Sequence, residues 1–368
     1  MKIIAFYLPQ FHTFPENDKW WGKGFTEWTN TKKGKPNFTG HYQPHTPLNG
    51  NYYDLVKDEN VLPEQIRLAK EYGVDGFCFY HYWFAQGKKL MEKPIERFLA
   101  DKSLNMPFCL CWANENWSRR WDGSEQSVLI AQDYGDGEDR KNHIEYLMKF
   151  FSDERYLRDE KGRPILLIYK PQLIDNLDVL LAEWREAVMA AGFPGVCFAC
   201  QYPQNDRSLR DKFDHWIDFE PAATTAIPGD NFLKAFRICP KYAMEVGFTK
   251  VLQLLNIRTY KKYYYNDAAT ASSKRPIEDD KEWVGAFTGW DNTARRGKNS
   301  IVYDGSTPER FEQYLTAQIM KSIRAGQEGI VFINAWNEWA EGAHLEPDER
   351  YGLKYLEALK KSKELCKK

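Results

Sequence analysis

The stretch GIVFINAWNEWAEGAHLEPD, residues 329–348, joins a short apolar run to a dense group of acidic and aromatic side chains. The apolar run, Gly329–Asn334, has the length and composition of a buried strand. Three carboxylates follow it, Glu338, Glu341 and Glu346, among two tryptophans and a histidine. Acids and indole rings just past a strand indicate a site at the carboxyl end of a parallel sheet.

Similar runs recur along the chain, separated by stretches with helical spacing. We predict strands at Ile3–Leu8, Gly76–Tyr82, Pro107–Trp112, Ile165–Lys170, Val196–Gln201, Trp216–Phe219, Val284–Phe287 and Ile330–Ala335. Helices are predicted at Leu62–Tyr72, Ile174–Ala191, Thr307–Ala325 and Tyr351–Leu365. Strand followed by helix, repeated to a final helix, predicts an α/β fold, a (β/α)8 TIM barrel.

We expect one barrel domain over residues 1–368, with long loops at about 9–61 and 220–282. The alternative fold is a doubly wound open sheet. No GxGxxG follows a predicted strand, which argues against a dinucleotide-binding version of that sheet.

Charge and cysteine usage exclude several classes of protein. The 51 Lys and Arg nearly balance 52 Asp and Glu, which argues against a nucleic-acid partner. No apolar run approaches the roughly 20 residues of a membrane span, so membrane insertion is not expected. The start, MKIIAFYLPQF, indicates a first strand and no signal peptide, and the seven cysteines indicate free thiols. We therefore expect a cytoplasmic protein without a metal or other cofactor, and leave its oligomeric state open.

Aromatic residues are unusually frequent. Thirteen Trp, 21 Tyr and 22 Phe make up 15% of the chain, and many stand beside polar residues. Rings for stacking and polar groups for orientation suit a flat ligand rich in hydroxyl groups. The composition thus indicates an oligosaccharide or polysaccharide as the partner.

In a barrel, the loops that follow the strands meet at one face. The candidate substrate-binding residues are those near the predicted strand ends and in the first long loop: Tyr7, Trp21, Trp28, His81, Tyr82, Trp112, Asn114, Glu115, Trp117, Tyr202, Trp290, Asp291, Trp336 and Asn337. Two of them have a structural alternative. His81 can be a core imidazole, and Glu115 can pair with Arg119 or Arg120.

Glu338 and Glu341 are the candidate catalytic residues. Glycoside hydrolysis needs two carboxyl groups with different pKa values, and apolar indole neighbours raise one of them. A spacing of three residues can bring both side chains to one side of a turn. Alternatively, Glu341 caps the next element and Glu338 pairs with an arginine. The aromatic residues at the other strand ends favour the catalytic interpretation.

Five motifs resemble the WbsX-type proteins, which are labelled as glycosyltransferases or as glycoside hydrolase family 99-like and often occur in polysaccharide gene clusters. The motifs are IIAFYLPQFH, NDKWWGKGFTEWTN, YHYWF, WANENWSRRWDG and NAWNEWAEGAHLEPD. The resemblance covers nearly the whole chain. It implies the (β/α)8 fold of the family 99 endo-α-mannosidases.

Those mannosidases carry an NEWxEG segment after the last strand, and Asn337–Gly342 matches it. By this resemblance, Glu341 is the general acid/base. Glu338 deprotonates the neighbouring sugar hydroxyl, which attacks the anomeric carbon and gives an anhydro-sugar with net retention. The histidine that usually follows the tryptophan in that family is Ala340 in this chain.

The function expected from residues and resemblance is a retaining glycoside hydrolase for an α-linked, mannoside-like bond in an oligo- or polysaccharide. Two alternatives stay open. One is a glycosyltransferase of surface polysaccharide biosynthesis of the O-antigen type, for which SRRWDG is the only candidate phosphate cradle. The other is a carbohydrate-binding barrel without catalysis.

Overall fold

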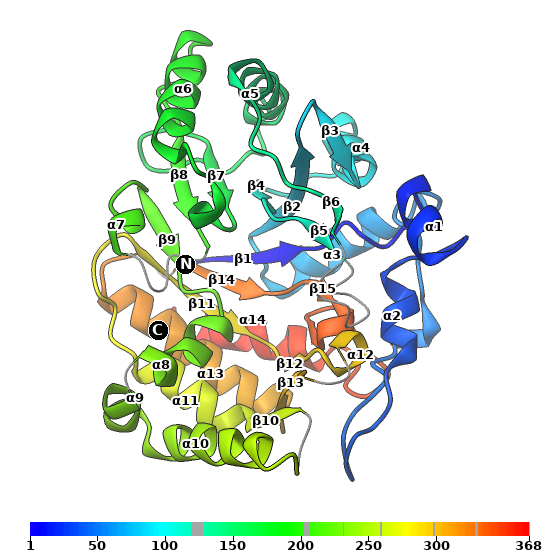
Figure 1. The fold of residues 1–368 in the computed structure, drawn as a ribbon, viewed down its shortest axis with the longest axis vertical. Coiled ribbons are helices and arrows are strands. Elements are labelled where there is room, and N and C mark those ends of the chain that lie inside the picture. The colour runs from blue at the N-terminus through cyan, green and yellow to red at the C-terminus, as the bar shows by residue number, and fades with distance from the viewer. Residues whose placement is uncertain are drawn as a thin grey trace.

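The computed structural model describes residues 1–118, 128–201, 207–230, 232–257, 260–296, 299–327 and 330–367. Within them, eight parallel strands form a closed barrel (Figure 1). Strand β1 pairs with β14 on one side and with β2 on the other, which closes the sheet. The barrel strands are β1 (Lys2–Tyr7), β2 (Gly76–Phe84), β4 (Phe108–Trp112), β7 (Ile165–Ile168), β8 (Cys197–Cys200), β9 (His215–Ile217), β11 (Glu282–Phe287) and β14 (Ile330–Asn334).

The (β/α)8 fold class is thereby confirmed, with each strand near its predicted position. The barrel interior is filled by aromatic rings, because Phe6 packs against Tyr80, Phe219 and Phe332 at centroid distances of 5.6, 5.3 and 5.8 Å. Side chains alternate between the interior and the outside along each strand. The neighbouring Tyr7 therefore points outward, toward the helices.

Helices cover the outside of the barrel. They are α3 (Val61–Tyr72), α4 (Glu92–Ala100), α5 (Gly137–Phe151), α6 (Leu177–Ala190), α7 (Arg207–Arg210), α11 (Tyr265–Lys274), α13 (Pro308–Arg324) and α14 (Lys354–Cys366). The predicted start of α13 at Thr307 is seen in the structure: the hydroxyl of Thr307 accepts a hydrogen bond from the backbone N–H of Arg310 at 3.3 Å and so caps the helix. The final helix packs on α13 and α3, which joins the two ends of the chain.

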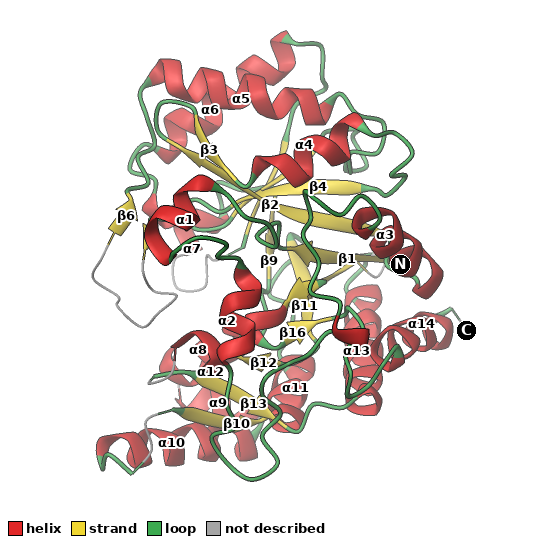
Figure 2. Ribbon diagram, turned by 90° about the vertical axis from the view of Figure 1, so that its right-hand side faces the viewer, coloured by secondary structure: helices red, strands yellow, loops and turns green. Residues whose placement is uncertain are grey.

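Both predicted long loops contain regular structure. The first holds α1 (Pro15–Trp21), α2 (Glu27–Lys33) and a short 3-10 turn. The second is mostly helical: α8 (Ala222–Asp230), α9 (Phe232–Ile238) and α10 (Pro240–Leu254) lead to β10 (Lys261–Tyr264) and α11. Strand β10 joins β13 (Ile301–Asp304) and β12 (Trp290–Asp291) in a small sheet beside the barrel (Figure 2).

Two further expectations concerned the cysteines and the membrane. All seven cysteines have free thiols, and six of them are buried. In the part of the chain that the structure describes, no helix has both the length and the apolar content that a membrane span requires.

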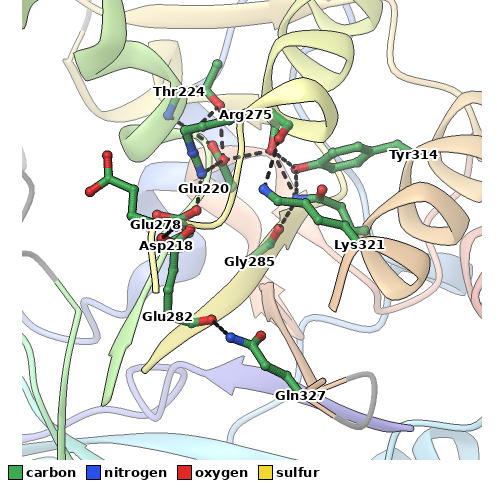
Figure 3. Close-up of polar contacts among 12 residues, drawn as sticks. Asp218, Glu220, Thr224, Arg275, Glu278, Glu282, Gly285, Tyr314, Lys321 and Gln327 are labelled. Atoms are coloured by element: carbon green, nitrogen blue, oxygen red, sulfur yellow. Dashed lines mark hydrogen bonds and ion pairs between the residues drawn. The ribbon is translucent and has the colours of Figure 1, made fainter. Parts of the chain in front are cut away.

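A buried network of charges holds the end of β9 against the outer helices (Figure 3). The guanidinium of Arg275, just after α11, contacts the carboxylate of Asp218 and donates to that of Glu220 at 2.8 Å. Glu220 also accepts hydrogen bonds from the hydroxyl groups of Thr224 and Ser272, at 3.0 and 2.8 Å. These contacts fix the start of the loop that follows β9.

The same network leaves no space for a side chain at Gly285 of β11. A Cβ there would lie 1.8 Å from the backbone oxygen of Asp218, so β9 and β11 would have to separate. We expect Gly285→Ala to lower the free energy of unfolding by about 3 kcal/mol or more, measured by urea denaturation. The control is Gly137→Ala, whose added carbon would lie 3.8 Å from Arg140. Equal stability of both variants would contradict this account of the β9–β11 packing.

Candidate active site

A cavity of about 520 Å³ opens at the carboxyl ends of the barrel strands. Its walls come from the loops after β1, β4, β7, β9, β11 and β14, and from two tyrosines of β2. The volume falls in the range of pockets that enclose small organic ligands. In a barrel of this kind, this face is where catalytic residues are found.

Glu338 and Glu341 both line this cavity. After β14 the chain forms a hairpin of β15 (Asn337–Glu338) and β16 (Ala343–His344), joined by a 3-10 turn, Trp339–Glu341. The tight turn brings the two carboxyl groups to the same wall. It ends at Gly342, which has a φ of 60° and faces Asp291 so closely that a Cβ would lie 3.1 Å from it. Glycine suits both conditions.

One arginine contacts both acids. Arg295 lies on α12 (Thr293–Arg296), in the loop after β11. Its Nη1 is 2.6 Å from a carboxylate oxygen of Glu341, and its Nη2 is 3.4 Å from one of Glu338. Its Nε donates to the buried Glu27 of α2 at 2.7 Å. The two cavity carboxylates are therefore held within the width of a single guanidinium group.

The two cavity acids differ in their surroundings. The side chain of Glu338 is 9% exposed, whereas that of Glu341 is 20% exposed. Burial, together with the negative charge of Glu341, raises the pKa of Glu338 to about 8, although the positive charge of Arg295 opposes the shift. At neutral pH the carboxyl group of Glu338 is therefore largely protonated.

Aromatic rings and further polar groups complete the walls. Trp117, Tyr169 and Trp290 line the cavity, and the ring of Trp117 meets Tyr82 edge-on at 5.5 Å. The hydroxyl of Tyr82 accepts a hydrogen bond from Gln10 at 2.9 Å. Rings beside hydrogen-bonding groups provide the surface that a sugar ring requires.

Two cations also lie along the walls. The ammonium of Lys170 contacts the carboxylate of Glu115, and the side chain of Arg296 lines the cavity next to Arg295. The alternative partners considered for Glu115, Arg119 and Arg120, lie outside the described residues.

The structure brings together part of the predicted set of site residues. Those that line the cavity are Tyr82, Glu115, Trp117, Trp290, Glu338 and Glu341. Tyr202 lies outside the described residues. The remaining predicted residues do not line the cavity: Tyr7, Trp21, Trp28, His81, Trp112, Asn114, Asp291, Trp336 and Asn337.

Strand alternation explains three of these absences. Tyr7, His81 and Trp112 occupy the outward positions of their strands. The hydroxyl of Tyr7 donates to Gln65 of α3 at 2.6 Å. Nε2 of His81 lies 2.9 Å from Nε2 of His143 on α5, the core position that the sequence left as an alternative. The ring of Trp112 packs on a tryptophan of α6.

Two of the predicted asparagines bind backbone instead. Asn337 accepts from the N–H of Leu8 at 2.7 Å and donates to the carbonyl of Leu8 at 3.0 Å. Asn114 makes the same pair of contacts to Lys170, at 2.7 and 2.8 Å. These amides connect neighbouring strand ends, so they hold the walls of the cavity in position.

The other four contact residues that are not part of the cavity lining. Asp291 accepts hydrogen bonds from His41 and Gln43, at 2.7 and 2.6 Å, and from Thr293 at the start of α12. The other three are tryptophans packed against other rings: Trp21 against Phe25, Trp28 against Trp339, and Trp336 against Phe77.

Sequence reasoning missed several cavity residues. Arg295 is the most consequential, because it contacts both cavity acids. Its position after a barrel strand was the available signal, but the candidate residues of that loop stopped at Asp291. Tyr80 was also missed, although it shares the inward face of β2 with Tyr82.

The chain resembles known proteins in its family, its sequence and its fold. The family model described as "Glycosyltransferase WbsX" matches residues 3–359. Two curated proteins, each called "Uncharacterized protein WxcX" and from two strains of Xanthomonas campestris pv. campestris, are 39% identical over 363 residues. The match covers 98% of this chain and 49% of each relative, so the chain spans about half the length of these relatives.

Two solved structures have a similar fold. One is the GH99 endo-alpha-mannosidase from Bacteroides thetaiotaomicron, with a TM-score of 0.54, 14% identity, and coverage of 99% of this chain and 97% of that one. The other, a "Glycoside hydrolase-like protein", has a TM-score of 0.57, 13% identity, and coverage of 98% and 93%. At these identities the likeness concerns the fold. Together with the family match, it confirms the resemblance drawn from the five motifs.

The raised pKa of Glu338 has a consequence for stability. The unfolded chain releases this proton near the ordinary value of 4.5 and the folded chain near 8, so the folded state loses stability as pH rises between them. We expect Glu338→Gln to raise the free energy of unfolding at about pH 9 by about 1 kcal/mol or more, with no gain near pH 4. Urea denaturation at the two pH values measures this.

The matched control for stability is Glu341→Gln. It removes the 2.6 Å ion pair with Arg295 from a more exposed carboxylate, so it should lower the free energy of unfolding at about pH 9. A loss of stability in Glu338→Gln at both pH values would show that Glu338 is held mainly by its ion pair.

Proposed function

The chain belongs to the WbsX family, and from this premise, together with the geometry of the cavity, we propose that it is a retaining glycoside hydrolase acting on an α-linked oligo- or polysaccharide. The observation that carries the proposal is the pair of carboxyl groups, Glu338 and Glu341, on one guanidinium in an aromatic cavity. Glycoside hydrolysis generally uses two carboxyl groups, one as an acid and the other as a base or nucleophile. The GH99 endo-alpha-mannosidase of similar fold supports an α-mannoside-like bond as the target.

In the proposed reaction, the two acids share one proton. The reactive state has this proton on Glu341 and leaves Glu338 ionised. Glu341 donates its proton to the departing glycosidic oxygen, while Glu338 removes a proton from the hydroxyl next to the anomeric carbon. That hydroxyl oxygen attacks the anomeric carbon, and an anhydro-sugar forms as the glycosidic bond breaks.

The second half of the reaction reverses the proton transfers. Glu341 takes a proton from water as the water oxygen attacks the anomeric carbon. The bond between that carbon and the anhydro oxygen breaks, and Glu338 returns its proton to this oxygen, which becomes the hydroxyl again. Two inversions at one carbon give net retention. A carboxylate whose pKa lies near 8 is a stronger base than an ordinary glutamate, which suits Glu338 to deprotonate an alcohol.

Arg295 positions both carboxyl groups in this scheme. It keeps a positive charge beside them and fixes them against the same wall. Sugar rings would stack on Trp117, Tyr169 and Trp290, which line the cavity around the acids.

A glycosyltransferase is the second candidate, and the description of the matched family favours it. A nucleotide-sugar donor would need cations for its phosphates, and Lys170 and Arg296 are those that line the cavity beyond Arg295. The phosphate cradle expected at SRRWDG lies, apart from Ser118, outside the described residues. A rise in melting temperature with a nucleotide sugar, followed by sugar transfer, would favour this candidate.

A screen of the purified protein against α-linked oligosaccharides tests the hydrolase proposal. Nuclear magnetic resonance of the released sugar reports its first anomeric form. We expect the α-anomer first, and we expect Glu338→Gln and Glu341→Gln each to lower kcat by about 10³-fold. The exposed Glu349→Gln is the matched control and should keep full activity. Release of the β-anomer, or full activity in both cavity variants, would refute the proposed mechanism.

The pH dependence gives a separate test. Because the carboxyl pair loses its last proton near pH 8, no acid remains for the leaving oxygen above that value. We expect kcat/KM to fall about tenfold per pH unit above about pH 8. Circular dichroism over the same range checks that the protein stays folded. A rate that is flat to about pH 10 would show that the shared proton is not used.

A further inference from the structure

Large apolar side chains lie exposed on α9, α10 and the turn that follows. We name this surface the α9–α10 face; its residues are Leu233, Phe236, Met244, Phe248, Val251, Leu254, Leu255 and Ile257. Leu254 is 81% exposed and Leu233 70%. Both ribbon views place α10 at the outer edge of the molecule, beside the small sheet and away from the barrel helices α5 and α6 (Figures 1 and 2).

The face follows the periodicity of α10. Met244, Phe248, Val251 and Leu255 are spaced by four, three and four residues, so they form one stripe along the helix. The opposite stripe, which includes Tyr242 and Val246, is buried against the rest of the protein. A surface helix usually carries polar residues on its outer side, so an apolar outer stripe marks a binding surface.

The charges around this face are almost all positive. Among the described side chains of α9 and α10, Arg237, Lys241 and Lys250 are exposed cations, and Glu245 is the one acid. The carboxylate of Glu245 accepts a hydrogen bond from the backbone N–H of Tyr264 at 2.8 Å, so it is already engaged within the protein. The face therefore combines exposed apolar side chains with exposed basic ones.

We propose that the α9–α10 face binds the surface of an anionic lipid membrane. Helices that lie in the membrane interface combine an apolar stripe, which enters the headgroup boundary, with lysines and arginines that contact lipid phosphates. Phe236 and Phe248 provide aromatic groups, and Arg237, Lys241 and Lys250 provide the charges. In this arrangement α10 lies along the membrane surface, with its apolar stripe toward the lipid.

Charge also argues against a second copy of the chain as the occupant. In a twofold pair the same patch meets itself, so Lys241 and Lys250 of both copies would approach with few acids to pair them. An anionic surface, in contrast, attracts these lysines.

Membrane binding at this face would orient the cavity. Helix α8, just before α9, contributes Ala222, Thr225 and Ala226 to the cavity wall. The wall and the proposed docking surface thus belong to one continuous segment. The inference rests on exposure and charge, and it holds whichever reaction the cavity performs.

The test uses the full chain and lipid vesicles in a co-sedimentation assay. The anionic vesicles are phosphatidylcholine with about 30% phosphatidylglycerol, and the neutral ones are phosphatidylcholine alone. We expect the protein to bind anionic vesicles about tenfold or more tightly than neutral ones, and to be released as salt is raised.

Two variants separate the apolar and charged contributions. Phe248→Ser with Leu255→Ser should weaken binding to anionic vesicles about tenfold, and Lys241→Glu with Lys250→Glu should abolish it. The control is Val179→Ser with Met189→Ser, which removes two half-exposed apolar residues from α6 and should bind as the parent does. Circular dichroism establishes that each variant is folded.

Three results would overturn the proposal: no binding to anionic vesicles, equal binding by the control and the Phe248/Leu255 variant, or equal binding to neutral vesicles. Analytical ultracentrifugation gives a fourth. A dimer that dissociates in the Phe248/Leu255 variant would assign the face to a second copy of the chain.

Discussion

The candidate site depends on a single buried guanidinium. Arg295 contacts Glu27 from the first long loop and both Glu338 and Glu341 from the loop after the last strand. Without it, three acids would share a poorly solvated space, which no protein tolerates without protonating some of them. Its single positive charge offsets one of the three carboxylates, and protonation of Glu338, whose pKa is raised to about 8, removes a second negative charge at neutral pH. The protonation state of these acids is thus a result of how three distant segments pack on one side chain.

Much of the architecture followed from the sequence, because buried parallel strands are apolar on both faces and punctuated by helices with clear ends. Alternation within those strands was the weak point. Tyr82 and His81 are adjacent, yet one faces the cavity and the other the outer helices. The prediction took every polar or aromatic residue at a strand end, so it included side chains that face the cavity and side chains that face the outer helices. Arg295 was missed for another reason: its partners, Glu27 and the two cavity acids, lie far from it in sequence, and only the folded chain brings them together.

The walls around the acids are held by contacts that leave the cavity free. Asn114 and Asn337 each bind both backbone groups of a residue on a neighbouring strand end, and so replace a missing rung of the sheet. Arg275 and its carboxylate partners do the same for the loop after β9. A cavity whose walls are fixed by backbone contacts keeps the side chains that line it in place before a ligand arrives, which lowers the entropic cost of binding.

The small sheet has a consequence for how this barrel can vary. Strand β10 comes from the segment between β9 and β11, whereas β12 and β13 come from the loop after β11, and the three strands share one hydrogen-bonded ladder. That loop also carries Arg295. Recombination between homologues can therefore exchange the segment between β9 and β11 only together with the loop after β11. A chimera with its crossover at β11 would pair strands of different ancestry and misplace the arginine on which the acids rely.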